Sequence, residues 1–307
     1  MYGSDDPRSR LAGAAQTPYS SAAGPMRFAA AEYVKFHDQP PGETSEYART
    51  WYGRGQNFVV AYTEAAASAV LVRDDQLDEY LVLIPERGLE VTISTPRETR
   101  IVSGHSLVIV PPGRSLVTAS SHGKIVRVFS AQSPDLVALA SNAHSYTQPH
   151  PNIPPYQPWP ASPGGHRLRV YDLDVPAQEG RFGRLWRCST LMINVLPAEA
   201  GPRDLARLSP HHHEDFEQGS LALQGSFTHH IRWPWTANIH DWRTDDHEVC
   251  AAPSLAVIPP PAIHTSAGSD PAMNQLVDIF SPPRMDFSRM PGWVLNADEY
   301  PLPEPPR

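Results

Sequence analysis

The chain has 307 residues, of which 40% are hydrophobic and 19% charged, and this length allows one large domain or two domains of ordinary size. Its formal net charge of −8, without a block of Lys or Arg, argues against nucleic acid or an anionic membrane as the main partner. No run of about 18 apolar residues predicts a membrane span, and the two cysteines, Cys188 and Cys250, exclude a disulfide framework and a cysteine-rich zinc site.

The first half of the chain contains a small-residue tail followed by a series of short strands. Residues 1–26 are rich in Ala, Gly, Ser and Pro, which predicts a flexible tail. They lack the basic-then-apolar layout of a secretion signal, so we expect a cytoplasmic protein. Within residues 27–145, short runs rich in β-branched residues begin at Phe58 and predict six or more antiparallel strands, with one short helix in 133–144.

The second half repeats the plan of the first after a proline-rich linker. Residues 146–165 are dense in proline and predict an extended connection. The strand pattern returns over 166–280, and 281–307 is a proline-rich arm without strand periodicity, expected to lie across another surface. "SLVIVPP" (106–112) and "SLAVIPP" (254–260) share Ser-Leu, three residues and Pro-Pro. A duplicated unit of about 100 residues is the simplest explanation.

Histidines gather in the second half in a recognisable order. His211 and His213 are separated by one residue, Gln218 follows after four more residues, and Gly225 after a further six. "PPPAIH" then ends at His264, with a proline where a Pro-x-Gly-x-x-His motif would have glycine. These two segments resemble the metal motifs of the cupin family, and the whole chain resembles a bicupin.

The resemblance implies an all-β fold with two tandem cupin barrels, each a double-stranded β-helix, or jelly roll. It also implies a metal motif that is intact only in the C-terminal barrel. In residues 27–145, Arg73, Asp75 and Glu79 stand where the motif would have His, His and Glu. Leu116 stands where the last histidine would be. Arginine and leucine do not bind metal, so we expect a metal-free N-terminal barrel, in which Glu79 and Arg73 form either a buried or a surface ion pair.

The histidine spacing suits a metal centre inside a barrel. Residues i and i+2 of a strand point to the same side, so His211 and His213 can face one point. His264 would reach that point from a distant strand. Gln218 is the preferred fourth ligand because it fits the spacing to the glycine, and Glu217 is the alternative because it is a carboxylate. Such a set suits one divalent transition-metal ion; the resemblance implies Fe(II), and Mn, Ni, Zn and Cu stay open.

Within the family, this centre implies a mononuclear non-haem Fe(II) dioxygenase that acts on a small, anionic, aromatic or enolisable substrate with O2. Here His230 would move protons and Arg232 would hold the anionic group of the substrate. Two alternatives stay open: a redox-neutral metal-assisted isomerase, lyase or hydrolase, and a non-catalytic small-ligand-binding cupin. We also expect a homodimer, because cupin barrels often pair through exposed strands.

Overall fold

A computed structural model of the protein describes residues 7–8 and 28–304. The predicted tail therefore lies outside the described residues, except for Pro7 and Arg8. The α-helices are short: α1 (Pro134–Leu139) and α2 (Met285–Arg289). The 3-10 helices are η2 (Phe36–Asp38), η3 (Ala143–Tyr146), η4 (Leu205–Arg207) and η5 (Ile239–Asp241). None of the helices in this part of the chain is long and apolar enough to cross a lipid bilayer.

Strands make up most of the remaining regular structure. Those before the linker are β1 (Glu32–Lys35), β2 (Glu43–Thr44), β3 (Ala48–Arg54), β4 (Phe58–Ala65), β5 (Val70–Gln76), β6 (Tyr80–Ile84), β7 (Val91–Ser94), β8 (Thr99–Val102), β9 (Ser106–Val110), β10 (Gly113–Ala119) and β11 (Gly123–Ser130). Those after it are β12 (Arg169–Asp172), β13 (Leu185–Arg187), β14 (Met192–Val195), β15 (Glu199–Ala200), β16 (Gln218–Gln224), β17 (Ser226–Arg232), β18 (Asp246–Ala251), β19 (Ser254–Ile258), β20 (Ile263–Gly268) and β21 (Met273–Phe280).

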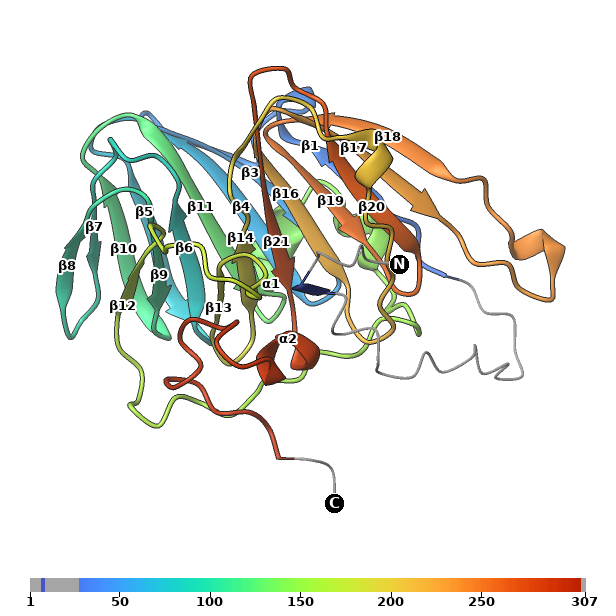
Figure 1. Ribbon diagram of the computed structural model, residues 1–307. Coiled ribbons are helices and arrows are strands. Elements are labelled where there is room, and N and C mark those ends of the chain that lie inside the picture. The colour runs from blue at the N-terminus through green and yellow to red at the C-terminus, as the bar shows by residue number, and fades with distance from the viewer. Residues whose placement is uncertain (1–6, 9–27, 305–307) are drawn as a thin grey trace.

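Each half of the molecule is a sandwich of one large and one small antiparallel sheet (Figure 1). In the N-terminal barrel, the large sheet runs β12-β9-β6-β11-β4-β3-β2 and the small sheet β5-β10-β7-β8. In the C-terminal barrel, the large sheet runs β1-β19-β16-β21-β14-β13, with β15 on β21, and the small sheet β18-β17-β20. The predicted fold class, two tandem jelly-roll barrels, is confirmed.

The two halves exchange one strand each, so their sheets do not follow the predicted boundaries. β1, from the first half, pairs with β19, with Glu32 opposite Val257. β12, from the second half, pairs with β9, with Arg169 opposite Ile109. Each exchanged strand covers the edge of the other half's large sheet, which would otherwise expose unpaired backbone groups.

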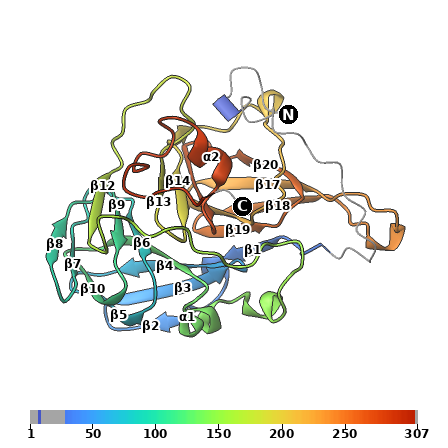
Figure 2. The same cartoon turned by 90° about the horizontal axis from the view of Figure 1, so that it is seen from below.

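The two large sheets also share one apolar core between the barrels (Figures 1 and 2). Phe58 and Val128 from the first half pack in the same cluster as Leu221 and Ile279 from the second. Gly219 permits a close approach of the two sheets, because a Cβ atom there would lie 2.9 Å from Cζ of Phe58. The sheets are therefore apolar on this face, and the other face of each lines its own barrel.

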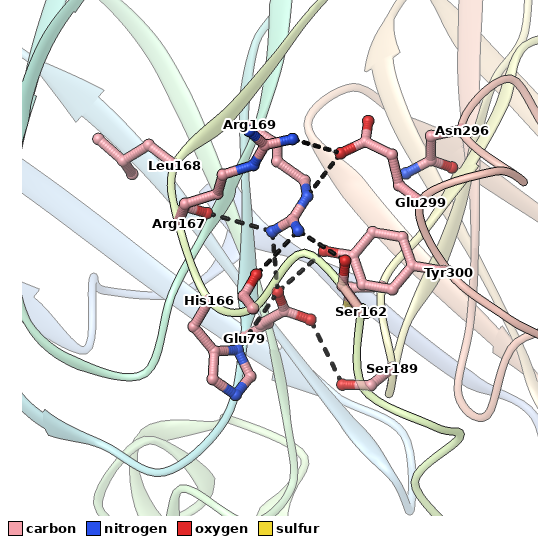
Figure 3. A network of polar contacts seen from close by, with 12 residues as sticks. Glu79, Ser162, His166, Arg167, Leu168, Arg169, Ser189, Asn296, Glu299 and Tyr300 are labelled. Atoms are coloured by element: carbon pink, nitrogen blue, oxygen red, sulfur yellow. Dashed lines mark hydrogen bonds and ion pairs between the residues drawn. The ribbon is translucent and has the colours of Figure 1, made fainter.

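A buried polar network ties the C-terminal arm to the first half (Figure 3). Glu79, which is 1% exposed, accepts hydrogen bonds from the Tyr300 hydroxyl at 2.8 Å and from the Ser189 hydroxyl at 3.4 Å. The Arg169 guanidinium lies 3.6 Å from Glu79 and 2.6 Å from Glu299. The end of the arm therefore reaches the N-terminal barrel, whereas Phe287, Trp293 and Val294 pack against the C-terminal barrel.

The ion pair considered between Glu79 and Arg73 is not formed. Arg73 instead pairs with Asp135, at the start of α1, at 2.5 Å. The two residues belong to different sheets, because Arg73 lies in β5 of the small sheet. Glu79 instead immediately precedes β6 of the large sheet and points toward the second half.

The shared core predicts that Phe58→Ala destabilises both barrels together. Phe58 is fully buried, and Phe-to-Ala changes in cores cost about 3–5 kcal/mol. We expect a loss of that size in the free energy of unfolding, within a single transition, when urea unfolding is followed by tryptophan fluorescence and circular dichroism. Leu77→Ala is the control, because Leu77 is 69% exposed and its loss should change stability by less than about 0.5 kcal/mol. Two separate transitions in Phe58→Ala would contradict a common core.

Candidate metal centre

A cavity of about 880 Å³ opens into the C-terminal barrel. His211, Gln218 and His264 line it, together with Ser266 of β20 and Asp278 of β21. The cavity therefore collects three of the four preferred metal ligands. It is also the place where strands far apart in sequence, β16, β20 and β21, present side chains to one space.

The three predicted imidazoles are neighbours. His211 and His264 form an antiparallel bridge, in which the backbone N–H of each donates to the carbonyl of the other, at 3.0 and 2.7 Å. Their ring centroids lie 4.4 Å apart. The centroid of His213 lies 5.0 Å from that of His264. His264 therefore contacts both other rings, as the motif spacing implied.

Burial keeps these imidazoles neutral, which is the form that binds metal. It lowers the pKa of His264 to about 4, and it holds the pKa values of His211 and His213 well below the usual range. Nδ1 of His264 donates to the Ala262 carbonyl at 2.9 Å, so Nε2 carries the lone pair. That Nε2 atom and both ring nitrogens of His213 are buried without a hydrogen-bond partner. A buried polar atom in this state costs about 1–3 kcal/mol, and a bound ion would remove that cost.

The side chains as they stand do not complete a metal site. In the described part of the chain, no group of three or more His, Cys, Asp or Glu side chains is arranged to hold a metal ion. The ring of His213 stacks on Phe216, with centroids 4.0 Å apart and planes inclined by 26°. Donor chemistry and buried nitrogens fit a divalent ion, but His213 would have to leave Phe216 to share a point with the other rings. The metal centre stays a prediction.

The two candidates for the fourth ligand face opposite ways. The Gln218 amide lies at the cavity, where its Nε2 donates to the Ser220 hydroxyl at 3.1 Å and to Asp278 at 3.2 Å. Glu217 instead accepts from the Tyr146 hydroxyl at 2.8 Å and from the Gln56 backbone at 2.6 Å. Burial raises the pKa of Glu217 to about 7. Both oxygens of Glu217 are therefore engaged with the first half, whereas Gln218 is at hand for the imidazoles.

Neither predicted catalytic residue lies in the cavity. His230 is on the outer face of the small sheet, where its Nδ1 contacts Nδ1 of His247 at 2.8 Å. The Arg232 side chain is 71% exposed and pairs with Asp245 at 2.9 Å. Side chains of a strand alternate, and here the inward one is His229, which is 1% exposed. The prediction of His230 and Arg232 as catalytic residues is therefore wrong, because both share the outward face of β17.

The inward histidine has a route to the cavity. Nδ1 of His229 lies 2.8 Å from the hydroxyl of Ser266, which lines the cavity. Nε2 of His229 is buried without a hydrogen-bond partner. Burial also lowers the pKa of His229 to about 4. His229 is therefore a neutral proton acceptor that can reach the cavity through one hydroxyl group.

Four arginines that the sequence did not single out line the cavity: Arg8, Arg203, Arg207 and Arg284. Arg8 and Arg203 each donate to the Ser209 hydroxyl at 3.1 Å. Arg284 pairs with Asp286 at 2.5 Å and lies over the ring of Phe287. These residues come from the tail, from irregular segments and from the end of η4, where no periodic pattern indicates which way a side chain points.

Comparisons with known proteins identify the fold. No protein-family model and no curated protein matches the sequence. Among solved structures, the oxalate decarboxylase of Lactobacillus farciminis in a formate complex matches with a TM-score of 0.54 and 14% identity, over 82% of this chain and 86% of that chain. The 7S globulin of Momordica charantia matches with a TM-score of 0.51 and 12% identity, over 82% and 84%. The chain has the bicupin fold.

At such low identity the likeness concerns the fold alone. One of these two structures is named for an enzymatic activity and the other is named a globulin. A bicupin fold therefore does not decide whether the chain catalyses a reaction, and the argument for function has to come from the site.

The opposite orientations of Gln218 and Glu217 predict different effects on metal binding. Gln218→Ala should weaken binding by at least about tenfold, a size of effect that even outer partners of metal ligands show. Glu217→Gln should leave binding unchanged, because the amide oxygen can still accept from the Gln56 N–H while the amide nitrogen donates to the Tyr146 hydroxyl oxygen. Affinities would be measured by anaerobic titration with Fe(II) and Mn(II), with metal content checked by mass spectrometry. The reverse pattern would make Glu217 the ligand.

Proposed function

We propose that this bicupin is a metal-dependent enzyme whose C-terminal barrel binds one divalent transition-metal ion through His211, His213, His264 and Gln218. The activity we propose is that of a mononuclear non-haem Fe(II) dioxygenase acting on a small anionic substrate, aromatic or enolisable. The observation that carries the proposal is the contact of three neutral imidazoles, two of which have buried nitrogens without a hydrogen-bond partner.

The protein's own groups would prepare this centre. When bound, Fe(II) would supply a Lewis acid and a source of electrons for dioxygen. The Ala262 carbonyl fixes the tautomer of His264, and Asp278 and Ser220 orient the Gln218 amide. With four neutral ligands, the Asp278 carboxyl beside Gln218 would offset at most one unit of the charge of the ion, so the centre would still favour an anionic substrate.

The cavity walls supply the remaining roles. Arg203 and Arg8 lie at Ser209, close in sequence to His211, and would attract the anionic group of the substrate in place of Arg232. His229 would accept a proton from the substrate through the hydroxyl of Ser266, in place of His230. The arginines are assigned because they line the cavity, and His229 because it is buried and hydrogen-bonded to Ser266, which lines it.

A redox-neutral reaction on a small carboxylate is the second candidate. The same arginines would hold a carboxylate without any involvement of dioxygen, and an oxalate decarboxylase is among the structures with this fold. The two candidates share the metal centre and differ in whether dioxygen is consumed.

Dioxygen consumption therefore distinguishes the candidates. Metal-free protein would be loaded separately with Fe(II), Mn(II) or Zn(II) and mixed with small phenolic, enolisable and dicarboxylic acids, while oxygen uptake and CO2 release are recorded. We expect oxygen uptake with Fe(II) only, reduced by at least about a hundredfold in His264→Ala, which removes a ligand.

Three outcomes would redirect the proposal. CO2 release without oxygen uptake would favour the redox-neutral reaction. Metal and ligand binding without turnover would indicate a non-catalytic binding protein. Equal metal content in wild-type protein, His213→Ala and His264→Ala would contradict the metal centre itself. His230→Ala is the matched control, because its side chain lies on the outer face and its loss should change none of these readouts.

The proton route gives a further prediction. His229→Ala should lower kcat by about 10²–10⁴, the usual contribution of a positioned proton acceptor, while metal content stays at the wild-type level. Steady-state kinetics and metal analysis on the same preparation would measure both. Loss of metal in this variant would make His229 a ligand or a support of the ligands instead.

A further inference from the structure

The N-terminal barrel has a cavity of its own, of about 1000 Å³. Its walls come from β3, β5 and β11 and from α1. Tyr52, Arg73 and Arg127 line it, and no histidine does. This cavity therefore has a different chemistry from the cavity of the C-terminal barrel.

Arg127 is the unusual residue of this cavity. It lies in β11 and is 3% exposed, and its Nε atom is buried without a hydrogen-bond partner. Within the described residues its guanidinium forms no ion pair. A buried charge without a counter-charge is costly, so such residues are normally paired with an opposite charge.

The neighbouring groups do not neutralise Arg127. The nearest carboxylate, Glu43, is exposed at the cavity wall and reaches Arg127 only through the Tyr52 hydroxyl, which interacts with the guanidinium and donates to Glu43. Arg73 is the second cation of the cavity. Both guanidinium groups lie near the ring of Phe129, at 5.4 Å for Arg73 and 5.6 Å for Arg127. Two cations therefore flank one ring at the inner end of the cavity.

The rim carries the opposite charge. Asp74, Asp75 and Asp135 line the opening and are largely exposed, with side-chain exposures of 70% for Asp74 and 59% for Asp135. This rim would repel a multiply charged anion more strongly than a monoanion. A monoanion that passes the rim meets Arg127. Leu71 and Leu136, both buried, give the walls an apolar part.

We propose that the N-terminal cavity is a second, metal-independent site, which binds a small monocarboxylate with its carboxylate group on Arg127 and its apolar part between Leu71 and Leu136. A guanidinium suits this ligand because its planar fork donates two parallel hydrogen bonds to a carboxylate. The site is independent of the metal centre, since none of its residues belongs to the C-terminal barrel.

The test uses full-length, metal-free protein and benzoate as the probe, with binding measured by calorimetry and by the shift in melting temperature. Benzoate should bind to wild-type protein and to His264→Ala alike. Arg127→Gln should abolish binding, and its melting temperature without ligand should not fall, because an unpaired buried charge has been removed. Arg100→Gln is the control, since Arg100 is 59% exposed, pairs with Glu98 and lies outside the cavity.

A second variant covers the case in which Arg127→Gln does not fold. Arg127→Lys keeps the charge and loses the fork, so benzoate should bind about tenfold more weakly, as expected for one lost hydrogen bond to a charged group. Binding that is unchanged in Arg127→Lys, or retained in folded Arg127→Gln, would overturn the proposal. Tighter binding of inorganic phosphate than of benzoate would overturn the choice of ligand class, and dependence on His264 would move the site to the other barrel.

Discussion

Face-to-face packing of the two large sheets is the constraint on which the rest of the molecule depends. Because Phe58 and Leu221 belong to one core, neither barrel can bury this face without the other. Two carboxylates lie at matching positions of this boundary. Tyr80 pairs with Val110 in the first half, and Gln218 pairs with Ile258 in the same way in the second half. Glu79 and Glu217 precede these residues, and each binds the hydroxyl of a tyrosine. These carboxylates therefore act at the junction between the halves.

The inner faces of the sheets are where the halves differ. The same alignment matches Ser220 of the second half with Val82 of the first. Asp278 pairs with Ser220 in one barrel, and Arg127 pairs with Val82 in the other. At the same distance after the paired prolines, His264 stands in one barrel and Leu116 in the other. One interior thus combines imidazoles with a carboxyl group and the other presents an arginine. The duplicated scaffold is suited to a cation in one barrel and to an anion in the other.

The repeated strands and motifs could be predicted from the sequence. The direction in which the side chains of a strand point, and the pairing of strands distant in sequence, could not. Period-two strands and the duplicated Pro-Pro segments were enough for two tandem barrels, and the spacing from His211 to His264 identified rings that meet. The sequence could not show whether His229 or His230 points inward, because these adjacent residues place a histidine on each face of the strand. The orientation depends on the turn at Gly225, which has a φ of +82°, a conformation natural to glycine. The exchanged strands β1 and β12 are four residues long, too short to indicate which sheet edge they join.

The proposed centre requires one movement, and its energetics favour it. His213 would give up its stack on Phe216, an interaction of about 0.5–1.5 kcal/mol. The ion would remove the cost of two buried nitrogens without partners, one on His213 and Nε2 of His264, at about 1–3 kcal/mol for each. His211 and His264 are already joined through their backbones, so they would define the position of the ion, and His213 would be the ligand that closes on it.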